Sequence, residues 1–272
     1  MTMRIIDLTD NFVEYVIRNK VPEEYHATFP DLFAHYYGFW ATPKPYGPGL
    51  TAQYVTRQAA LIRGQLPMIE SRFAEFGISL SDLQIVLFVG QSVSNGHAFE
   101  HKGKFVVWIP VEAYPSELQV QVFVPHEIVH ALHYERVPAF FFQTRRDKNR
   151  VSRQVITEGT ATYVSLNVMG LSAEMALWAD YLPREHVELW YSECCRQTSV
   201  LNKHVLDKWD DEDTGLFSLV DPGSVLQFRG GYFVGLRAIE YIARAAKAQA
   251  CTLMSLGKEE LESMVRDVLR ND

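Results

Sequence analysis

The sequence predicts an α+β fold that is mainly helical and contains one small, mostly antiparallel sheet. Amphipathic stretches that begin at capping residues recur along most of the 272 residues. Short apolar runs bounded by turn residues are instead confined to residues 83–109. With 47% hydrophobic and 22% charged residues, the chain can bury a sizeable core.

Residues 1–80 are expected to form a helical segment that packs on a larger domain, residues 81–272. Three helices are expected in this segment, each beginning at a capping residue or a proline and ending at a proline or a glycine: residues 10–20, 30–38 and 51–77. The stretch between the last two, residues 41–49, is too rich in proline and glycine for a helix or a strand. It is expected to form a loop.

The expected sheet lies between residues 83 and 109. Residues 83–89 and 104–109 are apolar runs, and residues 97–100 fit a short strand between them. Turn residues at 94–96 and 101–104 separate the three segments. Beyond residue 158 the chain reads as helical again, with Ser172 and Pro183 as helix starts.

Residues 126–130 read His-Glu-Ile-Val-His, an H-E-x-x-H pattern in an apolar stretch. Four residues make about one turn of α-helix, so His126 and His130 project from the same face and can offer two imidazole nitrogens to one ion. Glu127 points roughly 100° around the helix, which places its carboxylate beside a metal-bound water without making it a ligand. The pattern therefore predicts a catalytic metal site.

Two neighbours of this motif leave alternatives open. Pro125 lacks a helical hydrogen bond, so the helix either continues through it with a kink or begins near it. The length of residues 117–123 favours the kink. His133 lies two turns after His126, too far along the axis to join the same ion, and is expected to support the site or to pack in the core.

Two later segments accompany the motif: residues 157–163 read Thr-Glu-Gly-Thr-Ala-Thr-Tyr, and residues 229–235 read Arg-Gly-Gly-Tyr-Phe-Val-Gly. Together with H-E-x-x-H they resemble the gluzincin metallopeptidases, and more narrowly bacterial predicted zinc-dependent proteases of unknown function. The resemblance covers residues from about 82 to 245. The metzincin pattern does not fit, because His133 and Arg136 replace its glycine and its third histidine.

The resemblance implies a zincin-like fold in which the small sheet lies next to the H-E-x-x-H helix. It also implies that Zn²⁺ is bound by His126, His130 and Glu158, the last on a second helix downstream. If Glu158 is not the third ligand, three other residues are candidates: His133, Asp147 and His97. Thermolysin-like relatives carry an aspartate where this chain has Thr162, so the group that orients the ligand histidines is open.

The resemblance further implies that Tyr232, in the late glycine-tyrosine segment, donates a hydrogen bond to the oxyanion. Three other residues are alternative donors: Arg229, Tyr163 and His204. The expected function is a zinc-dependent metallopeptidase that hydrolyses peptide or protein substrates through a zinc-bound water activated by Glu127. Strand 97–100 fits the sheet edge that binds an extended substrate in such folds, and an ordinary hairpin explains the same pattern.

Two alternative functions are a zinc hydrolase that acts on a non-peptide substrate and a non-catalytic zinc-binding member of the fold. An intact Glu127 argues against the second, because a structural site gains nothing from a general base. The net charge of −7 argues against a nucleic-acid partner. No apolar run approaches the ~20 residues of a membrane span, and residues 1–10 do not read as a signal peptide. We therefore expect a cytoplasmic protein that binds no membrane.

Overall fold

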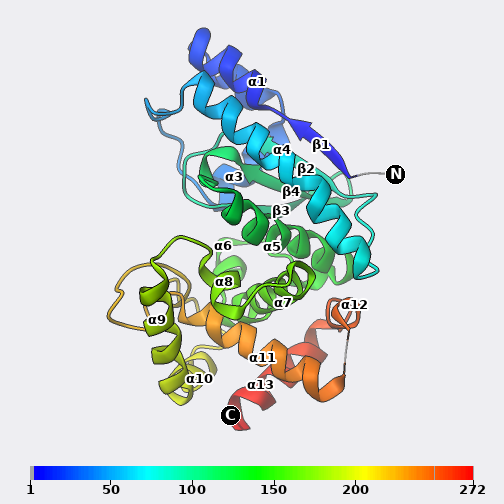
Figure 1. The fold of residues 1–272 in the computed structure, drawn as a ribbon, viewed down its shortest axis with the longest axis vertical. Helices are drawn as coiled ribbons and strands as arrows, with labels where there is room; N and C mark the ends of the chain where they lie inside the picture. The colour runs from blue at the N-terminus through cyan, green and yellow to red at the C-terminus, as the bar shows by residue number, and fades with distance from the viewer. Residues whose placement is uncertain (1–2, 248, 272) are drawn as a thin grey trace. The chain divides into compact units, whose positions relative to one another are not determined.

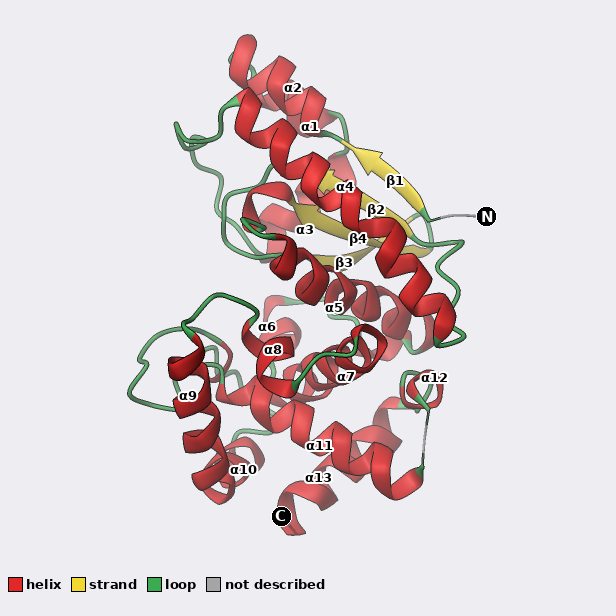
Figure 2. Cartoon of the chain, in the orientation of Figure 1, coloured by secondary structure: helices red, strands yellow, loops and turns green. Residues whose placement is uncertain are grey.

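The α+β class predicted from the sequence is confirmed by the computed structural model, which describes residues 3–247 and 249–271 (Figure 1). The chain divides into two compact units, Met1–Ala131 and Leu132–Asp272. The division falls within helix α5 (Glu117–Arg136). Among the described residues, the sheet belongs entirely to the first unit, and helices predominate in both (Figure 2).

The sheet has four strands in the order β1-β2-β4-β3, which places β3 at one edge. Their bounds are Arg4–Asp7 for β1, Gln84–Phe88 for β2, His97–His101 for β3 and Lys104–Pro110 for β4. The pairs β1–β2 and β2–β4 are parallel, and only β3–β4 is antiparallel. The sheet is therefore mixed, and the expectation of a mostly antiparallel sheet was wrong.

Two features of the chain path explain this mixed sheet. After β2 the chain does not form the neighbouring strand but the edge strand β3. The β3–β4 hairpin then reverses the chain, so that β4 lies between β3 and β2 and runs parallel to β2. Strand β1 comes from the segment that was expected to be helical throughout. It has only four residues, two of them charged, and its stability depends on pairing with β2. Arg4 N–H extends this pairing by donating to the carbonyl oxygen of Leu83, just before β2 (3.0 Å).

Among the described residues between β1 and β2 there are five helical elements: α1 (Thr9–Asn11), the π-helix η1 (Phe12–Arg18), α2 (Pro22–Ala27), α3 (Pro30–Phe39) and α4 (Ala52–Glu75). The predicted cap of α4 is confirmed, since Thr51 Oγ1 accepts a hydrogen bond from Tyr54 N–H (3.2 Å). Pro22 was expected only to stop the preceding helix, and it also opens α2, where its missing N–H costs nothing.

Helices cover both faces of the sheet in the first unit. On one face, the ring of Tyr36 on α3 lies 5.2 Å from that of Phe88 and 5.4 Å from that of Trp108. Ile109 follows Trp108 along β4, so its side chain points to the opposite face. There, Ile109 and Glu127 of α5 both border the space above Gly96. The motif helix thus packs on the face of the sheet opposite to α3.

Among the described residues of the second unit, the regular elements are helices, joined by loops that carry two isolated β-bridges. Its helices after α5 are α6 (Arg145–Asn149), α7 (Val151–Met169), α8 (Ala173–Trp178), α9 (Arg184–Arg196), α10 (Thr198–Asp207), α11 (Gly230–Ala246), α12 (Ala250–Leu253) and α13 (Lys258–Asn271). The predicted start at Ser172 is confirmed, because Ser172 Oγ accepts a hydrogen bond from Met175 N–H (3.2 Å).

Helices α7 and α11 cross with their backbones in contact, at Gly159 and Gly235. A β-carbon on Gly235 would overlap the carbonyl oxygen of Val155 and would lie 3.0 Å from Gly159 Cα. A β-carbon on Gly159 would likewise overlap the backbone of Gly235. The two glycine-containing segments singled out in the sequence are therefore packing partners, and their glycines permit this close approach.

We predict that Gly235→Ala lowers the free energy of unfolding by about 1–3 kcal/mol, because the added methyl group forces α7 and α11 apart. Urea denaturation followed by circular dichroism measures this change. The matched control is Gly64→Ala on the exposed face of α4, where nothing lies within 4 Å of the added carbon. That variant should gain about 0.4–1 kcal/mol. Equal stability of the two variants would contradict the proposed crossing.

Candidate metal centre

Helix α5 carries the H-E-x-x-H motif and runs continuously from Glu117 to Arg136, with Pro125 inside it. The alternative in which the helix begins near Pro125 is therefore wrong. Proline removes one backbone hydrogen bond from a helix. Complete burial of the apolar residues on either side, including Val124 and Ile128, offsets that loss.

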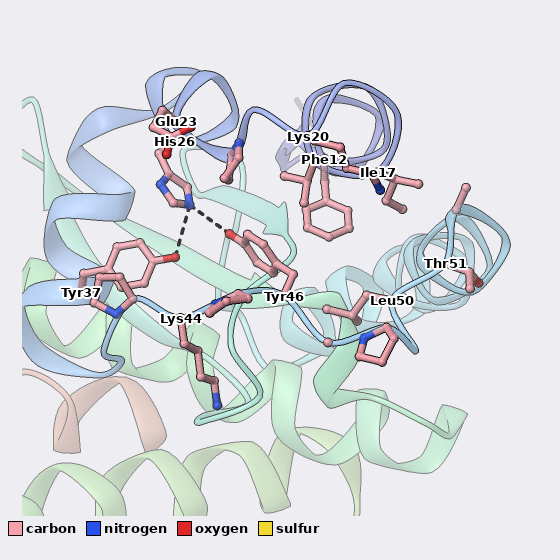
Figure 3. A pocket seen from close by; sticks show the side chains of 17 residues that line it. Phe12, Ile17, Lys20, Glu23, His26, Tyr37, Lys44, Tyr46, Leu50 and Thr51 are labelled. Carbon is pink, nitrogen blue, oxygen red and sulfur yellow. Dashed lines mark hydrogen bonds between the residues drawn. The ribbon is translucent and has the colours of Figure 1, made fainter.

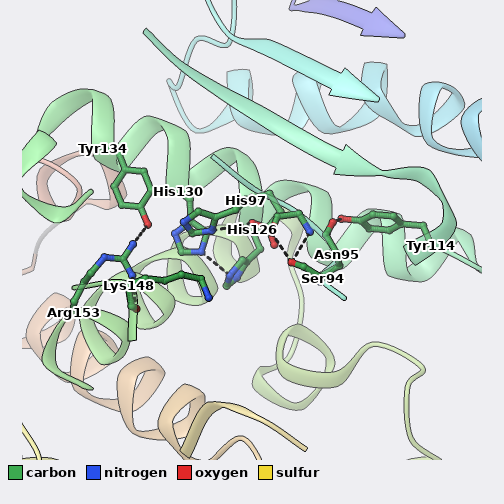
Figure 4. Close-up of polar contacts among 11 residues, drawn as sticks. Ser94, Asn95, His97, Tyr114, His126, His130, Tyr134, Lys148 and Arg153 are labelled. Atoms are coloured by element: carbon green, nitrogen blue, oxygen red, sulfur yellow. Dashed lines mark hydrogen bonds and ion pairs between the residues drawn. The ribbon is translucent and has the colours of Figure 1, made fainter. Parts of the chain in front are cut away.

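His126 and His130 turn their imidazole rings toward each other, with the two Nε2 atoms 3.1 Å apart (Figure 4). Both side chains are buried, with relative exposures of 8% and 1%. Two nitrogen ligands of a tetrahedral zinc ion stand about 3.3 Å apart, given Zn–N bonds of roughly 2.0–2.1 Å. The predicted one-turn spacing thus brings two ring nitrogens to a separation that a single ion can bridge.

Glu127 is 4% exposed and packs against the loop that leads into β3. Gly96 in this loop has φ +154°, and a β-carbon there would lie 2.7 Å from Glu127 Cγ and 3.0 Å from Trp108 O. Tyr114 holds the loop by donating a hydrogen bond to Asn95 O (Figure 4). A glycine in this loop therefore provides the space that the Glu127 side chain occupies.

His97, the first residue of β3, belongs to the same cluster. Its ring centroid lies 4.5 Å from that of His130, and its Nδ1 lies 3.8 Å from Glu127 Oε2. It is 3% exposed and packs against the ring of Trp40. The sequence indicated His97 only as a strand residue and a reserve ligand, because nothing in the linear pattern relates residue 97 to residue 127.

The residues of the first unit can therefore hold a metal ion in a way that the motif alone did not predict. Donor atoms of His97, Glu127 and His130 lie within 4.8 Å of one another. Two imidazoles and a carboxylate are ligands that Zn²⁺ accepts. In this set Glu127 is a ligand, whereas in the set predicted from the sequence it accepts a proton. The two arrangements share His130 and make different chemical demands on Glu127.

Glu158, the predicted third ligand, is buried on α7 in the second unit, with 8% relative exposure. Within that unit Lys148 interacts with it electrostatically. Burial and the nearby Arg153 lower the pKa of Lys148 to about 8, and Glu158 opposes the change. Arg153 is itself held in place, because it donates hydrogen bonds to Phe140 O (2.9 Å) and to Tyr134 Oη (2.6 Å) (Figure 4). Lys148 thus belongs to the surroundings of Glu158, and Arg153 lies next to Lys148.

Tyr232 is half-buried in the first turn of α11. The guanidinium of Arg229 lies 4.5 Å from its ring centroid and 4.9 Å from that of Trp178, so Arg229 contacts both aromatic rings. The ring of Phe217 packs edge-on against Tyr232 at 5.7 Å. These contacts fix the ring of Tyr232.

Three other predicted candidates have structural contacts of their own in the second unit. His204 Nε2 lies 2.7 Å from Asp213 Oδ2, which ties α10 to the loop that follows it. Tyr163 is half-buried, and its carbonyl oxygen accepts a hydrogen bond from Asn167 (2.7 Å). His133 is fully buried with its ring 4.6 Å from that of Phe140, as the packing interpretation requires.

In comparisons with known proteins, no family model, curated protein or solved structure matches this chain. In the part of the chain that the structure describes, no helix has the length and apolar character needed to cross a membrane.

Proposed function

We propose that this protein is a zinc-dependent metallopeptidase. The observation that carries the proposal is the convergence of His126 Nε2 and His130 Nε2, 3.1 Å apart, beside the buried carboxylate of Glu127. Buried imidazole and carboxylate groups are the donor types that zinc accepts. A general base next to a ligand pair is a requirement of hydrolysis and not of a structural zinc site.

In the proposed site His126, His130 and Glu158 bind the ion, and Glu127 is the general base. Bound zinc supplies a water molecule of lowered pKa and polarises a carbonyl group. Glu127 takes the proton of the attacking water and delivers it to the leaving amine.

A peptide substrate is favoured over other electrophiles by the position of β3. This strand forms an edge of the sheet and carries His97 at its start. An extended peptide can add to such an edge through main-chain hydrogen bonds, and its scissile bond would then lie near residues that β3 contacts, including Glu127 and His130. A zinc hydrolase with a non-peptide substrate would not need this edge.

The first test of this proposal is metal content. We expect about one zinc per chain in the purified protein and strong loss of zinc in each of His126→Ala, His130→Ala and Glu158→Ala. Plasma emission spectroscopy after dialysis measures the stoichiometry. His101→Ala, on the same strand as His97 and partnered by Asp31, is the control and should keep its zinc.

His97→Ala distinguishes the two donor sets. Under the proposed assignment this variant retains zinc, because His97 is not a ligand. Full zinc in Glu158→Ala together with loss in His97→Ala would contradict the assignment. That result would identify His97, Glu127 and His130 as the ligands.

The second test removes the base and leaves the ligands intact. Glu127→Gln should keep zinc and a wild-type thermal midpoint while turnover falls by roughly 10²-fold or more. Digestion of a peptide library, read by mass spectrometry, provides the rates. Glu117→Gln, an exposed position on the same helix, is the matched control and should digest the library like wild type. Undiminished cleavage by Glu127→Gln would rule out this base. Absence of cleavage by wild type, for peptides, esters and amides alike, would favour a binding role.

The third test concerns Tyr232, the proposed oxyanion donor. Tyr232→Phe should lower kcat by roughly 10²- to 10³-fold, the usual effect of losing one such donor. KM should change little, because the bond forms mainly in the transition state. Tyr241→Phe, exposed on the same helix, is the control. Unaltered kcat in Tyr232→Phe would leave Tyr232 with a packing role only.

A further inference from the structure

A cavity of about 700 Å³ lies in the first unit, and none of the residues of the candidate metal centre line it (Figure 3). Its walls come from η1, α2, the end of α3 and the loop over residues 41–51. Small-molecule sites in proteins have volumes of roughly 300–1,000 Å³. We call it the tyrosine cavity, after Tyr37 and Tyr46, which line it together with His26. Its size suits a small organic ligand.

Much of the wall of the tyrosine cavity is apolar. Phe12, Ile17 and Leu50 line it, together with four prolines: Pro22, Pro43, Pro45 and Pro48. Three of these prolines lie in the loop that the sequence predicted. Because a proline ring fixes φ, this wall is already restricted in conformation before any ligand binds. The cavity can therefore bury an apolar body with little ordering of the loop.

A polar group of three side chains interrupts this apolar wall. His26 Nε2 lies 3.0 Å from the hydroxyl of Tyr46 and 3.2 Å from that of Tyr37 (Figure 3). Burial lowers the pKa of His26, with Glu23 opposing the change, so the ring is neutral at neutral pH. In one tautomer Nε2 donates a hydrogen bond to one of the two tyrosine hydroxyls, and in the other it accepts a hydrogen bond from one of them. At least one of the two hydroxyl protons is therefore not bonded to Nε2, and it can turn from the neighbouring tyrosine to a further acceptor, because a hydroxyl hydrogen rotates to suit its partner.

The charged residues that line the cavity are two lysines, Lys20 and Lys44, and one glutamate, Glu23. Both lysines are exposed at its rim. The excess of positive charge at the rim attracts an anionic group, and the hydroxyl donor in the wall binds a hydrogen-bond acceptor. A carboxylate is both an anion and an acceptor, whereas an ammonium group is neither.

The backbone around the cavity is unusual in two independent ways. The seven residues of η1 form a π-helix, a conformation that is rare and frequently occurs at functional sites. Lys20 has φ +62°, a left-handed conformation that costs free energy for a residue other than glycine. Both features border the same cavity, which indicates that the backbone is shaped around it.

We propose that the tyrosine cavity binds a small carboxylate with an apolar aryl or alkyl body. The apolar body lies against Phe12, Ile17 and Leu50. Its carboxylate accepts a hydrogen bond from the Tyr37 and Tyr46 pair and is attracted by the two rim lysines. This site is separate from the proposed peptidase site and does not depend on it.

The probe for this site is 1-pyrenebutyrate, a fluorescent aryl-alkyl carboxylate, and its neutral analogue 1-pyrenebutanol is the matched ligand. Fluorescence titration of the full chain should give pyrenebutyrate a Kd at least tenfold lower than pyrenebutanol. The double variant Lys20→Glu/Lys44→Glu should raise the Kd of pyrenebutyrate roughly tenfold and leave that of pyrenebutanol unchanged. Lys104→Glu, exposed and outside this cavity, should behave like wild type.

Two further variants test the location of the probe. Ile17→Trp fills the cavity and should weaken the binding of both probes. Tyr46→Phe should weaken pyrenebutyrate binding severalfold, because it removes one of the two hydroxyls of the donor pair. Thermal melts identify any variant that fails to fold, and Leu50→Trp then replaces Ile17→Trp. Equal affinity for the two probes, no binding of pyrenebutyrate, or binding that persists in both filling variants would overturn the proposal.

Discussion

The burial of two histidines and a glutamate on one helix is the constraint on which the first unit depends. Transfer of such groups from water into a protein interior costs free energy unless hydrogen bonds or an ion compensate them. Helix α5 can bury them because they point into one cluster, where His126 and His130 bring their Nε2 atoms within 3.1 Å. A single divalent cation would compensate several of these groups at once.

Several features of the surrounding sheet follow from that cluster. Gly96 leaves room for the Glu127 side chain, and Tyr114 fixes the loop through Asn95. Strand β3 then begins with His97 beside Glu127 and His130. The turn before β3 therefore also fixes the residues that surround Glu127, the proposed general base.

In the second unit, the corresponding constraint is the backbone contact between α7 and α11. Gly159 and Gly235 can approach this closely because neither has a side chain, and the contact aligns two segments that are far apart in the sequence. Glu158 directly precedes one of these glycines, and Tyr232 lies one turn before the other. Substitutions at either glycine would therefore move both a proposed ligand and a proposed oxyanion donor.

The sequence by itself determined the features that depend on local geometry. The α+β class, the helix start at Thr51, the loop over residues 41–49 and the pairing of His126 with His130 follow from capping, proline content and helical period. Only the tertiary structure decided that β1 joins the sheet and that the sheet is mixed. It alone placed His97 beside Glu127 and brought His26, Tyr37 and Tyr46 together around a cavity. These features depend on contacts between residues distant in the chain, and such contacts leave no periodic trace in the sequence.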